Sequence, residues 1–241
     1  MLREPFTEKF YTYHSKYIEN VLALRQPQRE SLEIFARLCD ILTFSKEPNL
    51  GAELEAVHAL FPTLSSFERD FPSFCFALAT GIGKTRLMGA CIAYLRYEKG
   101  IKNFFVMAPN LTIYDKLKAD LGNTSNPKYV FKGLDLFAKP PRIIDGDNYA
   151  DFRQGTFGVN DVVINVFNIS KLNAESKGKN GEPARIKRLN EVLGTSYFEY
   201  LQSLPDLCIF MDESHHYHAD KSFDVINDLK PILGVELTAT P

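Results

Sequence analysis

The sequence of 241 residues contains no tryptophan and only four cysteines. The cysteines are far apart, and at least three fall in predicted core strands or helix faces, so all are interpreted as buried thiols. Their spacing fits neither a disulfide framework nor a zinc site. The four positions are Cys39, Cys75, Cys91 and Cys208.

Long apolar runs are also missing. No stretch approaches the ~18 residues of a membrane-spanning helix, and no apolar segment follows a basic N-terminus. The sequence therefore predicts a cytoplasmic protein without a membrane partner.

A basic excess is missing as well, because the formal net charge is −2. Any contact with nucleic acid must then be local. The best basic patch lies between Lys171 and Arg188, in a stretch interrupted by Gly178 and Gly181. A flexible solvated loop and a phosphate-contacting loop are both compatible with this composition.

Hydrophobic residues make up 45% of the chain, which is enough to bury a full core. Apolar runs and helical periods alternate along it, which predicts a parallel sheet with helices on both faces. Predicted helices cover 28–42, 52–60, 86–97 and 111–121, and predicted strands cover 74–78, 104–108, the region of Tyr129, 162–166, 207–211 and 235–238.

We expect two parts, an N-terminal extension over 1–72 and an ATP-binding lobe over 73–241. Residues 1–23 lack a strong period and fit either a docking arm or a frayed terminus. Residues 45–72 are interpreted as an insertion of unknown use.

A glycine-rich loop, Ala79-Thr80-Gly81-Ile82-Gly83-Lys84-Thr85, follows the apolar run Phe74–Leu78. The run is continuously apolar, which predicts a fully buried parallel strand. Gly81 and Gly83 let successive N–H groups point at phosphate oxygens at the start of a helix. Lys84 supplies charge for the outer phosphates, and the Thr85 hydroxyl is placed to ligate Mg²⁺. The sequence thus predicts a nucleoside triphosphate site, although the general pattern has glycine where Leu78 stands.

Two carboxylates, Asp212 and Glu213, follow a second apolar run, Leu207–Met211. Strands of open α/β sheets present their ligands at this carboxyl end. Asp212 is expected to hold Mg²⁺, and Glu213 to orient or deprotonate the attacking water. Alone, such a pair also fits a solvated turn. The neighbouring histidines, His215, His216 and His218, invite a metal-site interpretation, but no cysteine pair with suitable spacing accompanies them.

The loop, the segment Asp212-Glu213-Ser214-His215 and the segment Leu237-Thr238-Ala239-Thr240-Pro241 resemble motifs I, II and III of superfamily 2 DEAD/DEAH-type helicases. The resemblance implies a three-layer, RecA-like P-loop fold with a mostly parallel sheet and an N-terminal helical extension. It tolerates the missing first glycine, and it implies coupling roles for His215, Thr238 and Thr240.

Weaker segments resemble the family's lesser motifs. Leu24–Gln28 is similar to the segment whose glutamine reads adenine, which implies that Arg25 and Gln28 contact ATP along with Thr80, Ile82 and Arg86. Ala108–Thr112 and Asn165–Lys171 are similar to segments that contact the nucleic-acid backbone. This resemblance implicates Pro109, Asn110, Asn168 and Lys171.

Within the superfamily, the sequences of these segments are most similar to those of the restriction (Res) subunits of type III systems. The segments Arg185–Leu189 and Pro231–Gly234 share this similarity. The resemblance implies duplex DNA and a methyltransferase or specificity subunit as partners. The family continues beyond the motifs found here into a second RecA-like lobe and a nuclease domain. We therefore expect a weak or inactive ATP hydrolase when this segment is alone.

Two functions stay open at this point. The first is the ATP-binding lobe of a DNA helicase or translocase in a restriction system, with Lys84, Asp212 and Glu213 as its chemical core. The alternative is an ATP-dependent binding module or switch with little turnover of its own.

Overall fold

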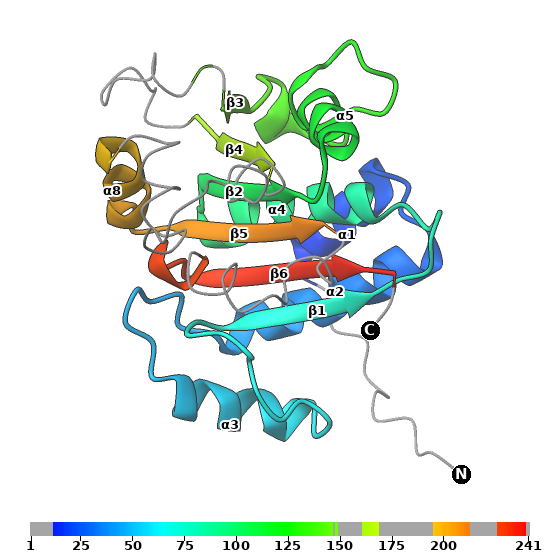
Figure 1. Cartoon of the computed structure of the whole chain (residues 1–241). Coiled ribbons are helices and arrows are strands. Elements are labelled where there is room, and N and C mark those ends of the chain that lie inside the picture. The colour runs from blue at the N-terminus through cyan, green and yellow to red at the C-terminus, as the bar shows by residue number, and fades with distance from the viewer. Residues whose placement is uncertain (1–11, 147, 149–160, 169–194, 213–225, 240–241) are drawn as a thin grey trace.

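In the computed structural model, a single six-stranded sheet carries helices on both of its faces (Figure 1). The structure describes residues 12–146, 148, 161–168, 195–212 and 226–239. The helices are α1 (Tyr13–Val21), α2 (Gln26–Ile41), α3 (Leu50–Leu60), α4 (Lys84–Lys99), α5 (Leu111–Gly122), the 3₁₀ turn η1 (Asp135–Phe137) and α8 (Thr195–Ser203). The strands are β1 (Ser73–Ala77), β2 (Asn103–Ala108), β3 (Arg142–Asp145), β4 (Val163–Asn168), β5 (Leu207–Asp212) and β6 (Leu233–Thr238).

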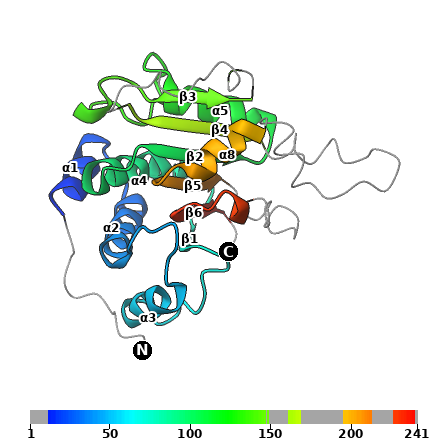
Figure 2. The same ribbon diagram turned by 90° about the vertical axis from the view of Figure 1, so that its left-hand side faces the viewer.

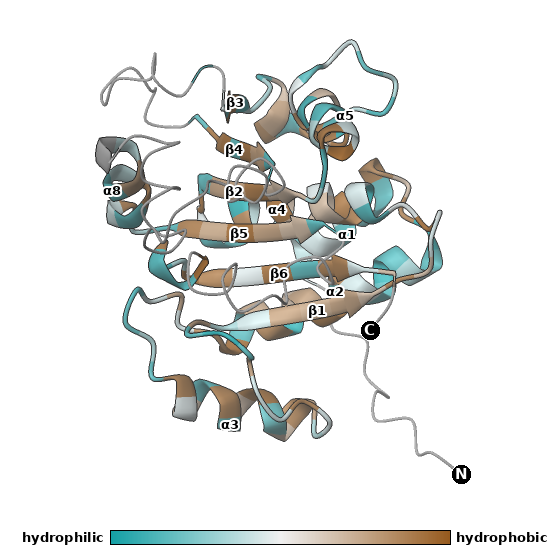
Figure 3. Cartoon of the chain, in the orientation of Figure 1, coloured by the Kyte–Doolittle hydropathy of each residue, from teal (hydrophilic) through white to brown (hydrophobic). Residues whose placement is uncertain are grey.

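The strand order is β1-β6-β5-β2-β4-β3, and every pairing is parallel. Parallel strands need crossover connections, and buried parallel strands are apolar throughout. Strands β2, β4, β5 and β6 are largely apolar, as expected for buried parallel strands. Every residue of β4, β5 and β6 is buried. Figure 3 shows these strands as largely hydrophobic. The predicted α/β fold with a parallel sheet is confirmed.

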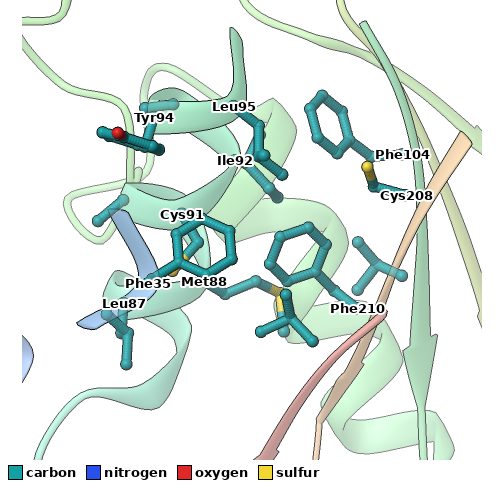
Figure 4. Packing of buried hydrophobic residues seen from close by; sticks show 14 of the residues in the cluster. Phe35, Leu87, Met88, Cys91, Ile92, Tyr94, Leu95, Phe104, Cys208 and Phe210 are labelled. Carbon is teal, nitrogen blue, oxygen red and sulfur yellow. The ribbon is translucent and has the colours of Figure 1, made fainter. Parts of the chain in front are cut away.

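Two apolar layers enclose the sheet (Figure 2). Helices α1, α2, α4 and α5 pack on one face, and α8 with residues 226–229 packs on the other. Figure 4 shows the larger layer, where Phe35 of α2 and Met88 of α4 meet Phe210 of β5. Helix α1 contributes Ile18 to this layer, so residues from the predicted extension share the core of the lobe.

The predicted burial of the strand at 74–78 is wrong. Strand β1 lies at the edge of the sheet beside β6, and only Ser73 and Phe74 of it are fully buried. Phe76 packs near Phe35 of α2. Cys75 is exposed, whereas the three other cysteines are buried. A continuous apolar run does not distinguish a central strand from an edge strand, because it does not show how many neighbouring strands and helices cover the strand.

The predicted strand near Tyr129 is also wrong. Residues 127–133 form turns, in which Tyr129 N donates to Asn126 O and Val130 N donates to Asp120 O. Tyr129, Phe131 and the nearby Phe137 are buried and pack ring against ring. The edge strand opposite β1 is β3, which the sequence analysis missed, as it missed α1 and α8.

Other boundaries agree to within a few residues. Helix α4 begins at Lys84 and ends where Gly100 adopts φ 70°, as the predicted stop requires. Helix α5 ends at Gly122 with Asn123 as its C-terminal cap. Among the described residues, no helix is long and apolar enough to cross a membrane.

Candidate nucleotide-binding site

The glycine-rich loop connects the carboxyl end of β1 to the first residue of α4. Gly81 has φ 83° and Gly83 has φ 97°, conformations that L residues rarely adopt. Gly83 is the N-cap of α4, and its carbonyl accepts from Arg86 N and Leu87 N. Free N–H groups at such a helix start, together with the helix dipole, favour a bound phosphate. The local structure therefore has the backbone geometry that a phosphate-binding loop requires, and phosphate binding itself stays a prediction.

The register of the sheet brings the separate motifs together. Ala77 of β1 pairs with Thr238 of β6, and Asp212 of β5 pairs with Leu237 of β6. Leu78 N, directly before the loop, donates to Thr238 O at 2.9 Å. Thr238 is 1% exposed and Asp212 is 5% exposed. The ends of three neighbouring strands thus bring the start of the loop, Asp212 and Thr238 side by side.

A cavity of about 560 Å³ opens beside the loop. Ten of its lining residues are ones that the sequence analysis named: Arg25, Gln28, Thr80, Gly81, Ile82, Gly83, Lys84, Thr85, Arg86 and Asp212. A volume of this size is typical of pockets that bind small molecules. Asp212 lines the same cavity as Lys84 and Thr85, so the structure does bring the loop and the carboxylate together.

Gln28 braces the loop from the neighbouring helix. Its Nε2 donates to Ile82 O at 3.1 Å and to Gly83 O at 2.9 Å, and its Oε1 accepts from Arg25 N at 2.8 Å. The residue is only 1% exposed. Both amide hydrogens are therefore directed at the loop, and the contact with adenine expected from the resemblance stays a prediction.

Two arginines donate hydrogen bonds to backbone carbonyls in the same region. Arg25 Nη1 lies 3.4 Å from Gly81 O, and Arg86 Nη1 donates to Leu22 O at 3.0 Å. The segment after α1 thus contacts the loop at Gly81 and helix α4 at Arg86.

Five lining residues were missed by the sequence analysis: Ile113, Lys116, Asp120, Lys128 and Val130. They belong to α5 and to the turns that follow it, far from the loop in sequence. Lys116 Nζ lies 3.0 Å from Thr85 Oγ1 and 3.8 Å from Asp120 Oδ2. The only sequence signal was the pair Lys116 and Asp120, one turn apart on a helix that begins at the same edge of the sheet.

Three of the residues expected to contact nucleic acid lie at the carboxyl ends of β2 and β4. Ala108 of β2 pairs with Asn168 of β4, so Pro109 and Asn110 follow directly beside Asn168. Asn110 is exposed and caps α5, since its Oδ1 accepts from Ile113 N at 3.0 Å. Pro109 and Asn168 are buried.

Several predicted residues lie outside the described part of the chain. These are Glu213, His215, Thr240 and Lys171, along with His216, His218 and the basic patch that ends at Arg188. Their predicted roles stay predictions. Among the residues that the structure describes, no cluster of histidine, cysteine and carboxylate groups is arranged to hold a metal ion.

A parallel sheet with a glycine-rich loop after one strand and an aspartate two strands away is the arrangement of a P-loop α/β domain of RecA-like fold. The family model for the type III restriction enzyme, res subunit, matches residues 13–241. The chain belongs to this family.

Individual relatives are more distant. The chain is 26% identical over 162 residues to the Haemophilus influenzae protein named "Probable type III restriction-modification enzyme HindVIP Res subunit". That match covers 63% of this chain and 27% of the relative, so the chain spans about a quarter of the relative's length.

Two solved structures match the chain at low sequence identity. The Sulfolobus solfataricus SWI2/SNF2 ATPase core in complex with dsDNA is 16% identical, with a TM-score of 0.45 over 100% of this chain and 34% of that one. A nuclease-deletion mutant of the type ISP restriction-modification enzyme LlaGI, in complex with a DNA substrate mimic, is 14% identical. Its TM-score is 0.40 over 80% of this chain and 17% of that one.

Proposed function

We propose that this chain is the ATP-binding lobe of a DNA translocase in a type III restriction system. The observation that carries the proposal is the shared cavity in which Lys84 and Thr85 of the loop meet Asp212 of β5. Five cationic and two anionic side chains line this cavity, a balance suited to a polyanion such as a triphosphate.

The residues divide the work of phosphate binding. Loop N–H groups and the start of α4 would bind the phosphates, with Lys84 adding a positive charge. Arg25, Thr80, Ile82 and Arg86 complete the walls, with Gln28 as the brace behind them.

The donor set also fits magnesium. Thr85 offers a hydroxyl and Asp212 a carboxylate, both largely buried and both lining the cavity, and Mg²⁺ prefers oxygen ligands. A bound Mg²⁺ would neutralise charge that develops on the outer phosphates. Glu213, the next residue after Asp212, would orient the attacking water.

Coupling to DNA would run along the sheet. Thr238 O accepts from Leu78 N directly before the loop, so a change in the loop would act on the strand that leads to Thr240. His215 would connect motif II to motif III. The backbone of duplex DNA would be contacted by Pro109, Asn110, Asn168 and Lys171. A second RecA-like lobe and a methyltransferase subunit would complete the translocase.

The test is ATP binding by calorimetry in Mg²⁺, followed by phosphate release with and without duplex DNA. Lys84→Ala removes a phosphate-facing charge from the first residue of α4, and Lys99→Ala is its matched control at the last residue. We expect binding by the wild type and the control, and loss of binding in Lys84→Ala.

Absence of binding by the wild-type chain would overturn the proposal. Phosphate release that duplex DNA stimulates would support the translocase. Binding with no release under either condition would fit both an ATP lobe that needs its second lobe and the nucleotide-dependent binding module.

A further inference from the structure

The Thr85 hydroxyl already has a cationic partner. Lys116 Nζ, from α5, donates to Thr85 Oγ1 at 3.0 Å. Thr85 is 9% exposed, whereas the Lys116 side chain is 48% exposed. The buried hydroxyl is thus held by a side chain that is free to change its conformation at small cost.

Thr85 Oγ1 is also the oxygen proposed as a magnesium ligand. An ammonium group at 3.0 Å and a divalent cation at the same oxygen would repel each other strongly, because the site is only partly solvated. Lys116 must therefore leave Thr85 when a metal nucleotide binds. This inference rests on the proposed function.

The surroundings of Lys116 indicate where the ammonium goes. Asp120, one helical turn on, is 3.8 Å away, but its Oδ1 already accepts from Asn126 Nδ2 at 2.8 Å. The larger source of negative charge would be the phosphates themselves, which the loop holds in the same cavity that Lys116 lines. An ammonium makes a charge-assisted bond to phosphate, which is stronger than its bond to a neutral hydroxyl.

We propose that Lys116 is a second phosphate-binding lysine of the ATP site, which rests on the Thr85 hydroxyl when no nucleotide is bound. It differs from Lys84 in origin, because α5 supplies it rather than the glycine-rich loop. The outer phosphates are its targets, since Thr85 lies at the end of the loop where Lys84 acts.

Calorimetry of ATP binding in EDTA tests this role without requiring the metal or turnover. Lys116→Met removes the charge and keeps an aliphatic stem, and Lys116→Arg restores the charge. Lys118→Met is the matched control, because Lys118 lies on the same helix but pairs with Asp145 instead of lining the cavity. Thermal melting of each variant reports whether the fold is intact.

We expect Lys116→Met to weaken ATP binding about tenfold, the usual value of one charge-assisted hydrogen bond. Lys116→Arg should recover most of the affinity, and Lys118→Met should bind like the wild type. Wild-type affinity in Lys116→Met would overturn the proposal and leave Lys116 as a structural partner of Thr85. An equal loss in Lys118→Met would also overturn it, because the effect would then belong to the helix.

The two proposals fail in different ways. If the wild type does not bind ATP, the proposed function fails and this inference falls with it. If Lys84→Ala abolishes binding while Lys116→Met does not change it, only the role of Lys116 is lost.

Discussion

Gln28 donates to the carbonyl oxygen of Gly83 at 2.9 Å, so a buried side chain of α2 holds the last glycine of the phosphate-binding loop. The same amide nitrogen reaches Ile82 O at 3.1 Å. Because the loop must present its N–H groups inward, its carbonyls point outward and need donors. Gln28 supplies them, and the shape of the loop therefore depends on a residue more than fifty positions upstream.

Replacing Gln28 with alanine should loosen the loop. Ile82 O would lose the bond from Gln28, and Gly83 O would keep only its bonds from the α4 backbone. We therefore expect ATP affinity to fall at least about tenfold. Calorimetry measures the loss. Gln26→Ala is the control, because Gln26 lies on the same helix and donates to Glu30 on the surface. Equal affinities in the two variants would contradict the bracing role.

Replacing Gly83 with alanine should damage the site more than the same change at Gly81. Both glycines have positive φ, but a Cβ at Gly83 would stand 2.7 Å from Gln28 Nε2, whereas one at Gly81 would meet nothing within 4 Å. Gly81→Ala should cost only the backbone strain, about 1 kcal/mol, and Gly83→Ala should cost more. Urea unfolding and ATP titration of both variants check this order, and a reversed order would exclude the clash as the cause.

A buried ion pair should govern stability beside the site. Arg69 contacts Glu236 Oε1 through Nη2 at 3.0 Å and through Nε at 3.1 Å, with side-chain exposures of 1% and 8%. Glu236 lies on β6, two residues before Thr238. Arg69→Met would leave the carboxylate buried without its counter-charge, so we expect a loss of about 3–5 kcal/mol in the free energy of unfolding.

The second variant of that series is Arg69→Met with Glu236→Gln, which removes both charges. It should recover part of the stability, because the uncompensated charge is gone. The control Lys16→Met removes a half-exposed lysine from Glu19, which keeps its pair with Arg29, and should cost less than about 1 kcal/mol. A loss in Arg69→Met no larger than in the control would contradict the prediction.

The carboxyl of Asp135 should contribute stability that depends on pH. Hydrogen bonds from Tyr97 and then Tyr17 lower the pKa of Asp135 in the folded state. A depressed carboxyl pKa stabilises the fold above the unfolded pKa and loses that contribution as the pH falls through the folded value. The stability difference between wild type and Tyr97→Phe should therefore be largest at neutral pH and shrink in acid. Urea titrations from pH 7 to pH 3 check it, and a constant difference would exclude Asp135 as the source.

Much of the fold could be predicted because local patterns encode it. The apolar runs of β2, β4, β5 and β6 and the periodic helices α2, α4 and α5 were placed to within a few residues. The run Tyr129-Val130-Phe131 has the same composition but forms turns, because its backbone bonds to Asn126 and Asp120 and its rings pack with Phe137. No local pattern distinguishes these cases, since the partners lie elsewhere in the chain.

The sequence by itself determined the loop from Thr80 to Thr85, the aspartate at the end of β5 and the family, because glycine spacing and strand-end carboxylates are properties of short segments. The tertiary structure alone decided three other features. Strand β1 is an edge strand with Cys75 exposed, Gln28 braces Gly83, and Lys116 reaches Thr85. Each depends on which elements become neighbours, and packing of the whole sheet sets that choice rather than any segment's own composition.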